Sequence, residues 1–254
     1  MDKINLNNVQ VIILAAGKGK RMQSENPKAL TNLKGKPFLK HILDTLSSVH
    51  LTLRPIIVVG HKKEAVMEAI GEGYHYAHQE EQLGTGHAVS SAKHKVEDGT
   101  EIIFVLSTDQ PMVSKETILN IIKRHEDKKP TVTIGTLVLP DFNEWRKGLM
   151  GFGRIIRDEG GKVVRNVEFK DATDDEKNIR EVNPAIYAFD ANWLWDNIDK
   201  IKNNNAQGEY YLTDLIGLAC KNGKGVEAVP IDNLLEGLQP NSKEELEILE
   251  SLTI

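Results

Sequence analysis

Short apolar segments alternate with segments of helical periodicity along the first half of the chain. Three apolar runs have the length of a buried strand, namely residues 9–14 (VQVIIL), 55–59 (PIIVV) and 102–106 (IIFVL). Between the first two runs lie Leu39, Ile42, Leu43 and Leu46, which have the i, i+3, i+4, i+7 spacing of an amphipathic helix. Strands that alternate with helices form βαβ units around a mostly parallel sheet. We therefore predict an α/β fold.

The pattern changes after about residue 130, where strand-like segments follow one another without long helices. We assign strands to residues 131–139, 161–169, 181–189 and 225–230, and helices to residues 192–203, 210–221 and 242–252. This half predicts an antiparallel or mixed addition to the sheet. Because no linker rich in proline or serine divides the chain, we expect one domain over residues 1–240 and a helical extension over residues 241–254.

Composition excludes several classes of protein. The chain has 32 Lys and Arg against 37 Asp and Glu, a net charge of −5, so nothing in its overall charge favours nucleic acid or an anionic membrane as a partner. Its one cysteine, Cys220, excludes an internal disulfide framework and a zinc site of several thiolates. No apolar run approaches the ~20 residues that span a bilayer. The first ten residues lack the basic and apolar parts of a signal peptide, and we expect a cytoplasmic protein.

A glycine loop follows the first predicted strand, with the sequence Leu14-Ala-Ala-Gly17-Lys-Gly19-Lys-Arg21. Ligands of α/β proteins bind beyond the carboxyl ends of strands, where glycines let the backbone approach a phosphate and cations attract it. A dinucleotide fingerprint would need a third glycine where Met22 stands, and the Gly-Lys-Ser/Thr of a P-loop is absent. The other interpretation is an ordinary turn with solvated lysines. We favour phosphate binding.

The loop resembles the signature of the sugar-nucleotide pyrophosphorylases, which is usually Leu-Ala-Ala-Gly-x-Gly-Thr-Arg-Met followed shortly by Pro-Lys. Here Pro27-Lys28 follows at the expected distance, and Lys20 replaces the threonine. The resemblance is greatest to the uridylyltransferase domain of bacterial N-acetylglucosamine-1-phosphate uridylyltransferases. It continues in further blocks: residues 82–88 (QLGTGHA), 151–154 (GFGR), 167–172 (VEFKDA), 181–183 (EVN) and 203–214 (NNNAQGEYYLTD).

This resemblance implies a Rossmann-like three-layer nucleotidyltransferase fold of the glycosyltransferase A type, with a smaller sugar-binding β portion and a C-terminal helix. It implies Mg²⁺-dependent transfer of UMP from UTP to N-acetylglucosamine 1-phosphate, which yields UDP-N-acetylglucosamine, a cell-wall precursor, and pyrophosphate. Arg21 and Lys28 would stabilise charge on the reacting phosphates, and Asp109 would bind Mg²⁺. The implied nucleotide contacts are Leu14, Ala15, Gly17, Lys28, Gln79, Gly84 and Thr85, and the implied sugar contacts are Gly153, Glu168 and Asn183.

Several of these residues also have a purely structural interpretation. Taken alone, Thr85 is typical of a helix N-cap, Asp109 of a turn and Glu168 of a solvated strand, and the family pattern decides against each. We interpret His87 as a structural residue.

The chain departs from the family pattern at three places. Ser107-Thr108-Asp109 stands where Tyr-Gly-Asp is common, and Asn183-Pro184-Ala185 stands where the family has Asn-Thr-Gly. The second metal ligand, an asparagine in the family, aligns with Gln239, although Asn241 is also available. These departures leave two alternatives open. The acceptor is another sugar 1-phosphate, such as glucose 1-phosphate or another hexosamine phosphate, or the donor is dTTP. A non-catalytic nucleotide-sugar sensor is a weaker alternative.

Many bacterial relatives continue into a left-handed helix of hexapeptide repeats that transfers an acetyl group. No such repeat occurs in this chain, so we expect no acetyl transfer from it. We expect either a natural single-function protein or part of a longer one. The sequence yields no prediction of the oligomeric state.

Overall fold

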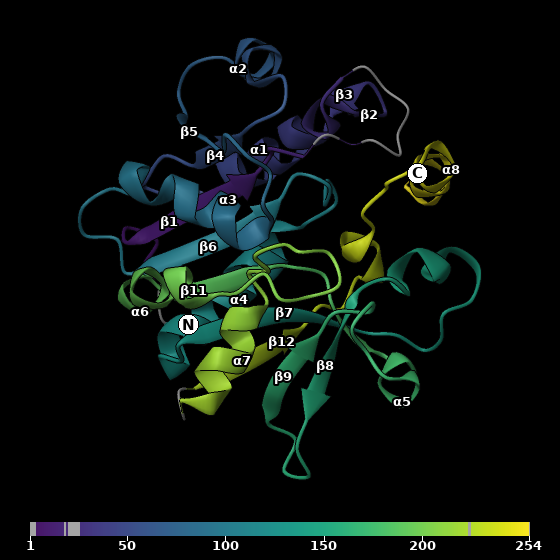
Figure 1. Ribbon diagram of the computed structural model, residues 1–254. Helices are drawn as coiled ribbons and strands as arrows, with labels where there is room; N and C mark the ends of the chain where they lie inside the picture. Colours follow the sequence, from purple (N-terminus) through teal and green to yellow (C-terminus); the bar gives the residue numbers. More distant parts are fainter. Residues whose placement is uncertain (1–3, 18, 20–25, 223–224, 254) are drawn as a thin grey trace.

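A mixed sheet forms the centre of the molecule (Figure 1). The computed structural model describes residues 4–17, 19, 26–222 and 225–253, and within these residues the sheet has ten strands. The path through the sheet is β5-β4-β1-β6-β11-β7-β10-β8-β9, and β12 pairs with β7 outside this path. A separate small hairpin is formed by β2 (Asn32–Leu33) and β3 (Lys36–Pro37).

The first half of the sheet is parallel, as the alternating pattern predicts. Its strands are β1 (Val9–Leu14), β4 (Ile56–Val59), β5 (His75–His78) and β6 (Ile102–Ser107). The helices of this half are α1 (Phe38–Val49), α2 (Lys63–Ile70), α3 (Thr85–Ala92) and α4 (Lys115–Lys128). Because parallel strands share one direction, β1 and β6 end side by side, with Leu14 opposite Ser107. The loops that follow these two strands therefore lie at the same edge of the sheet.

The second half of the sheet is mixed. Its strands are β7 (Val132–Val138), β8 (Gly153–Arg157), β9 (Val163–Val167), β10 (Glu181–Asn183), β11 (Tyr187–Asp190) and β12 (Val226–Pro230). Strand β11 runs antiparallel to both β6 and β7 and so joins the two halves. The β8–β9 hairpin extends away from the rest of the sheet, beside α5 (Asp174–Lys177) (Figure 1).

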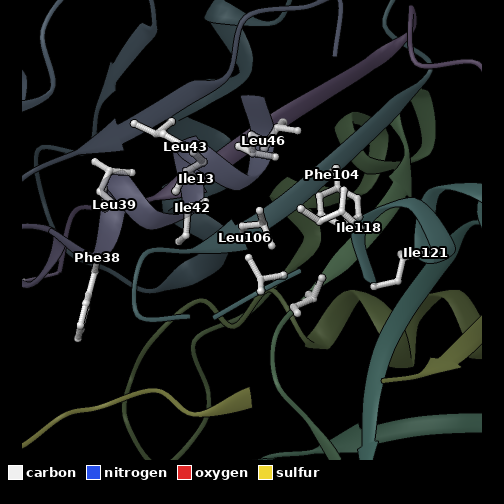
Figure 2. Close-up of a cluster of buried hydrophobic side chains, with 14 of the residues drawn as sticks. Ile13, Phe38, Leu39, Ile42, Leu43, Leu46, Phe104, Leu106, Ile118 and Ile121 are labelled. Carbon is white, nitrogen blue, oxygen red and sulfur yellow. The ribbon is translucent and has the colours of Figure 1, made fainter. Parts of the chain in front are cut away.

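Helices cover both faces of the sheet, which gives three layers. On one face, α1 and α4 pack against alternate residues of the strands, including Ile13, Phe104 and Leu106 (Figure 2). On the other face, Ile12 and Val105 contribute to a second core with α3, α6 (Ala191–Asn197) and α7 (Asp214–Lys221). A strand buried on both faces needs a continuous apolar run, which explains the VQVIIL and IIFVL segments.

The chain ends in helix α8 (Lys243–Leu252), which begins where Ser242 Oγ accepts a hydrogen bond from the Glu245 backbone N–H. Leu249 on this helix is fully buried and belongs to the same core as α1. Short 3-10 helices lie at Lys28–Leu30, Lys93–Lys95, Glu144–Leu149, Ile198–Lys200 and Leu234–Gly237. Among the described residues, no helix is long and apolar enough to cross a membrane.

The structure differs from three of the predicted elements, of which the helix predicted over residues 210–221 begins only at Asp214. The strand predicted over residues 181–189 is two strands, β10 and β11, because the chain turns between them at Pro184 and Ala185. Ala185 has a φ of 66°, in the left-handed region and far from the φ of an extended strand. The helix predicted over residues 192–203 ends as an α-helix at Asn197 and continues only as a 3-10 turn to Lys200.

Candidate active site

Two adjoining cavities lie beyond the carboxyl ends of β1 and β6. The first has a volume of about 220 Å³ and the second about 290 Å³. Both are lined by Leu14, Thr85, Ser107, Asp109 and Glu209, so they share one boundary. The remaining lining of the first cavity comes from Ala16, Gly17, Lys28, Gln79, Gln82, Gly84, Ala88 and Thr108. Such a pair of joined cavities suits two substrates that react at their common boundary.

Lys28 and Asp109 form an ion pair at this boundary. The Lys28 Nζ atom donates to Asp109 Oδ2 at 2.8 Å and to Asn241 Oδ1 at 2.6 Å. The side chains of Lys28 and Asp109 are only 11% and 17% exposed, so water screens their attraction weakly. An ammonium group has three N–H donors, and two are used here. Among the described residues the third N–H has no partner, so it can bind an anionic ligand in the first cavity.

Asp109 is an ionised carboxylate whose two oxygens have different surroundings. Burial raises its pKa, but the charge of Lys28 and the hydrogen bonds from Lys28 and Ser107 outweigh burial, so the pKa lies below its ordinary value. Its other oxygen, Oδ1, is buried and has no hydrogen-bond partner among the described residues. A buried carboxylate oxygen without a partner loses solvation that a cation restores. This oxygen therefore fits a divalent metal ion.

The described residues contain no group of three or more His, Cys, Asp or Glu side chains that could hold a metal alone. Mg²⁺ in nucleotide-binding sites usually takes one or two carboxylates, and phosphates and water supply the other oxygens. Asp109 Oδ1 together with a carboxamide oxygen matches this second arrangement.

The turn before α3 forms one wall of the first cavity. Gly84 has a φ of 115°, and a Cβ atom there would lie 2.7 Å from the Tyr210 carbonyl oxygen, so only glycine fits. The Tyr210 N–H donates to Leu83 O at 2.8 Å, and Thr85 Oγ1 accepts from the Leu212 N–H at 2.9 Å. Thr85 is thus not a side-chain N-cap, because its hydroxyl instead holds the chain at residues 210–212 against the start of α3.

Gln79 and His87 meet next to this turn. Gln79 Nε2 donates to Gly84 O at 3.1 Å and lies 3.2 Å from His87 Nδ1. His87 Nδ1 also lies 2.9 Å from Glu81 O. His87 does not line either cavity, which agrees with the structural role expected for it.

Glu168 lines the second cavity and is hydrogen-bonded to two other polar side chains. Its Oε1 atom accepts from Thr213 Oγ1 at 2.8 Å and from Asn166 Nδ2 at 3.1 Å. Burial raises the pKa of Glu168, and these two hydrogen bonds oppose the rise. Asn166 Oδ1 in turn accepts from Asn183 Nδ2 at 3.0 Å. A Cβ at Gly153 would lie 2.7 Å from Asn166 Oδ1, so the glycine makes room for this network.

Two glutamines hold the turn at the end of β10. Gln110 Nε2 and Gln239 Nε2 both donate to the Pro184 carbonyl oxygen, at 2.6 Å and 2.7 Å. Gln239 lines the second cavity, whereas Asn241 contacts Lys28 at the boundary. Gln239 uses its amide N–H to anchor Pro184, and Asn241 contacts the partner of Asp109, so the choice between these two carboxamides as second metal ligand stays a prediction.

The structure gathers most of the predicted site residues around these cavities. The first cavity is lined by Leu14, Gly17, Lys28, Gln79, Gly84 and Thr85, and the second by Gly153, Glu168, Asn183 and Gln239, with Asp109 on both. Ala15 is buried beside the cavities without lining them, and its N–H donates to Val58 O at 2.9 Å. Arg21 lies outside the described residues, as do Lys18 and Lys20.

Sequence reasoning missed four side chains of the second cavity and its wall. Asn166 and Thr213 bind Glu168, and Tyr187 and Tyr211 line the cavity. Thr213 and Tyr211 belong to the 203–214 block, which served only as a family signature. Its concentration of amides, tyrosines and acids was a signal for a ligand site. Tyr187 carried no such signal, because it stands among the apolar residues of a strand.

Comparisons with known proteins identify the family of the chain. A family model described as the MobA-like NTP transferase domain matches residues 11–141, more than half of the chain. The chain therefore belongs to this family and is a nucleotidyltransferase. The motifs predicted a sugar-nucleotide pyrophosphorylase similar to a uridylyltransferase domain, and this family match together with the relatives below confirms that prediction.

Curated relatives are named bifunctional protein GlmU. The relative from Brevibacillus brevis is 41% identical over 233 residues, which is 91% of this chain and 49% of the relative. The relative from Fervidobacterium nodosum is 41% identical over 244 residues, which is 96% of this chain and 50% of the relative. The chain thus spans about half the length of the curated relatives it matches.

A solved structure of UDP-glucose pyrophosphorylase complexed with UDP-glucose superposes with a TM-score of 0.76. The match covers 96% of this chain and 97% of that one, at 14% sequence identity. At this identity the match establishes the fold, and it confirms the predicted nucleotidyltransferase architecture.

Proposed function

We propose that this chain transfers UMP from UTP to N-acetylglucosamine 1-phosphate, releasing pyrophosphate. The observation that carries the proposal is the Lys28–Asp109 pair at the boundary of the two cavities. A reaction between two phosphates needs a cation and a metal-binding carboxylate where the phosphates meet. The bifunctional GlmU relatives, similar over about 90% of this chain, support the choice of substrates.

UTP occupies the first cavity in this proposal, with its base at the turn before α3. Gln79, Gly84 and Thr85 offer amide, backbone and hydroxyl groups that match the edge of a pyrimidine. The triphosphate extends over the loop of Gly17 toward Lys28. Arg21, outside the described residues, keeps its predicted role of stabilising charge on the triphosphate.

The sugar 1-phosphate occupies the second cavity, where Glu168 and Asn183 face a ligand rich in hydroxyl groups. Glu168 accepts hydrogen bonds from hydroxyls, and the Asn183 amide pairs with hydroxyl or acetamido groups. This arrangement places the phosphate of the sugar at the shared boundary, beside Asp109.

A phosphate oxygen of the acceptor attacks the α-phosphorus of UTP in line. The new P–O bond forms as the bond from the α-phosphorus to the bridging oxygen of pyrophosphate breaks, and pyrophosphate leaves with the electron pair. The acceptor phosphate is already ionised at neutral pH, so no side chain has to remove a proton. Lys28 stabilises the negative charge that develops on the phosphates.

A metal ion held at Asp109 would supply charge neutralisation and alignment of the phosphates. Asp109 Oδ1 and Asn241 Oδ1 are the oxygens that would hold it, and Lys28 now bridges these two side chains. Mg²⁺ is the ion we propose, since hard oxygen ligands and phosphates suit it.

A second candidate function keeps the reaction and changes the acceptor. Ser107 is a small residue on both cavities, and the Pro184–Ala185 turn shapes the second cavity. A different sugar 1-phosphate, or dTTP as the donor, is consistent with these residues.

Pyrophosphate release tests both candidates. The purified chain should be assayed with UTP and with dTTP against N-acetylglucosamine 1-phosphate, glucosamine 1-phosphate and glucose 1-phosphate, with Mg²⁺ and with EDTA. We expect the highest kcat/KM with UTP and N-acetylglucosamine 1-phosphate, and none with EDTA. A higher kcat/KM for another pair supports the second candidate. Binding of UDP-sugar without turnover for any pair refutes both and indicates a sensor.

A further inference from the structure

The hydroxyl group of Tyr187 is buried in the wall of the second cavity. Tyr187 is 2% exposed, yet its hydroxyl oxygen has no hydrogen-bond partner among the described residues. The residue lines the second cavity together with Glu168 and Asn183. Burial and the charge of Glu168 raise the pKa of Tyr187 above its ordinary value, and the nearby Asn183 side chain, which makes no hydrogen bond of good geometry to the hydroxyl, opposes this only weakly, so the hydroxyl is protonated and is a donor at physiological pH.

The position of this tyrosine is determined by the centre of the sheet. Tyr187 lies on β11 opposite Val105 of β6 and Ile134 of β7, so ladders on both sides hold its backbone. Its ring packs against that of Phe189, with 5.6 Å between the centroids. A hydroxyl on such a rigid element cannot easily turn toward water, so leaving it unpaired costs stability. A ligand that accepts its hydrogen bond removes this cost.

Neighbouring polar groups are largely used by the protein. Asn183 Oδ1 accepts from the Ala185 N–H at 2.9 Å, and Asn183 Nδ2 donates to Asn166. Glu168 Oε1 already accepts two hydrogen bonds, so Glu168 offers its second oxygen to a donor on the ligand. Tyr187 supplies the complementary group, a donor for an acceptor oxygen of the ligand.

We propose that Tyr187 is a specificity-determining residue that donates its hydroxyl hydrogen bond to an acceptor oxygen of the sugar. The oxygen belongs either to the acetamido carbonyl or to a ring hydroxyl. This inference rests on the proposed function, because it requires a sugar phosphate in the second cavity.

Tyr187→Phe removes the hydroxyl and leaves the ring in place. We expect KM for N-acetylglucosamine 1-phosphate to rise about three- to tenfold, the range for one neutral hydrogen bond. KM for UTP should stay within twofold, because UTP binds the other cavity. The thermal midpoint Tm of the free protein should stay equal or rise, because the variant no longer buries an unpaired hydroxyl.

Tyr76→Phe is the matched control. Tyr76 lies on β5, and its hydroxyl donates to Gly71 O at 2.7 Å, so it has a partner and lies outside both cavities. This variant should lower Tm and leave both KM values unchanged. Tyr187→Phe should therefore change KM without lowering Tm, and Tyr76→Phe should lower Tm without changing KM.

A panel of acceptors identifies the oxygen. If Tyr187 donates to the acetamido carbonyl, the rise in KM disappears with glucose 1-phosphate, and if it donates to a ring hydroxyl, the rise persists. Unchanged KM for every acceptor overturns the inference, as does an equal rise for UTP or a lower Tm. Wild-type protein without turnover on any sugar phosphate overturns the proposed function and this inference together. Active wild-type protein with an unaffected Tyr187→Phe variant overturns the inference alone.

Discussion

Lys28 and Asp109 are 81 residues apart in the chain, yet the Lys28 ammonium lies 2.8 Å from a carboxylate oxygen of Asp109. Lys28 follows the glycine loop after β1, and Asp109 follows β6, the parallel neighbour of β1. Adjacent parallel strands bring the loops after them to one edge of the sheet, so the pair is a direct consequence of the topology. The ion pair marks the place where the two cavities meet.

Removal of the Lys28 ammonium group should slow the chemical step. Lys28→Ala is expected to lower kcat by on the order of 10²–10³, because a preorganised charge beside the reacting phosphates is lost. Steady-state pyrophosphate release measures this. Lys36→Ala is the matched control, since Lys36 also pairs with an aspartate, Asp44 at 2.7 Å, but is exposed. Near-normal kcat in Lys28→Ala contradicts the assigned role.

The pair should also be coupled in the folding equilibrium. Lys28→Met and Asp109→Asn should each lower the free energy of unfolding by about 3 kcal/mol, because each leaves a poorly solvated partner. The double variant should lose less than the sum. Urea denaturation at pH 7 of all four proteins measures the coupling. The exposed Lys36–Asp44 pair should show a coupling of about 0–1 kcal/mol. Additive losses at Lys28 and Asp109 contradict the pairing.

Substitution of Asn241 should change the Mg²⁺ requirement, whereas substitution of Gln239 should change KM for the sugar phosphate. Asn241→Ala should raise the Mg²⁺ concentration for half-maximal rate at least about tenfold, because a metal-binding carboxamide is lost. Gln239→Ala should raise KM for the sugar phosphate, because the Pro184 carbonyl loses one of its two donors. Rates measured over Mg²⁺ and acceptor concentrations separate the two effects. The reverse pattern assigns the metal to Gln239.

Asp214 should make the fold less stable as pH rises through the acid range. Burial raises its pKa to about 6, and the charges of Glu168 and Asp171 add to this. An acid whose folded pKa exceeds its unfolded value, about 3.9, binds its proton more tightly when folded. Its stabilising contribution is therefore complete below pH 4 and lost between about pH 4 and pH 6.

Asp214→Asn removes this dependence. The variant should have a higher Tm than wild type above pH 6, and the difference should shrink toward pH 4. Thermal melts from pH 4 to pH 8 make the comparison, and a constant difference over this range speaks against a raised pKa.

The parallel half of the fold was predictable because its signal is local. Strands buried on both faces must be apolar throughout, and helices between them must carry an apolar stripe, so β1, β4, β6 and α1 all follow from the sequence pattern. The turn at Pro184 and Ala185 was missed, because apolar residues on both sides of it suggest one continuous strand. The hydrogen bonds from Gln110 and Gln239 that hold this turn come from distant parts of the chain.

The site was predictable where strand ends coincide with chemistry. Gly17, Lys28 and Asp109 follow strands and carry the residue types that phosphates need. The role of Tyr187 was not predictable, because its local sequence does not indicate whether the hydroxyl group has a hydrogen-bond partner within the protein. The contact between Asn241 and Lys28 was not predictable either, because it depends on how the segment before α8 packs against the rest of the chain. The division at residue 240 and the cytoplasmic location stay predictions.

The central claim is that UTP and a metal meet at Asp109, and a crystal structure with UTP and Mn²⁺ tests it most directly. Mn²⁺ replaces Mg²⁺ at oxygen ligands, and its anomalous signal locates it without ambiguity. We expect the anomalous peak about 2.1 Å from an Asp109 carboxylate oxygen and in contact with the triphosphate, with uracil in the first cavity beside Gln79. A nucleotide bound elsewhere, or a metal with no contact to Asp109, contradicts the account.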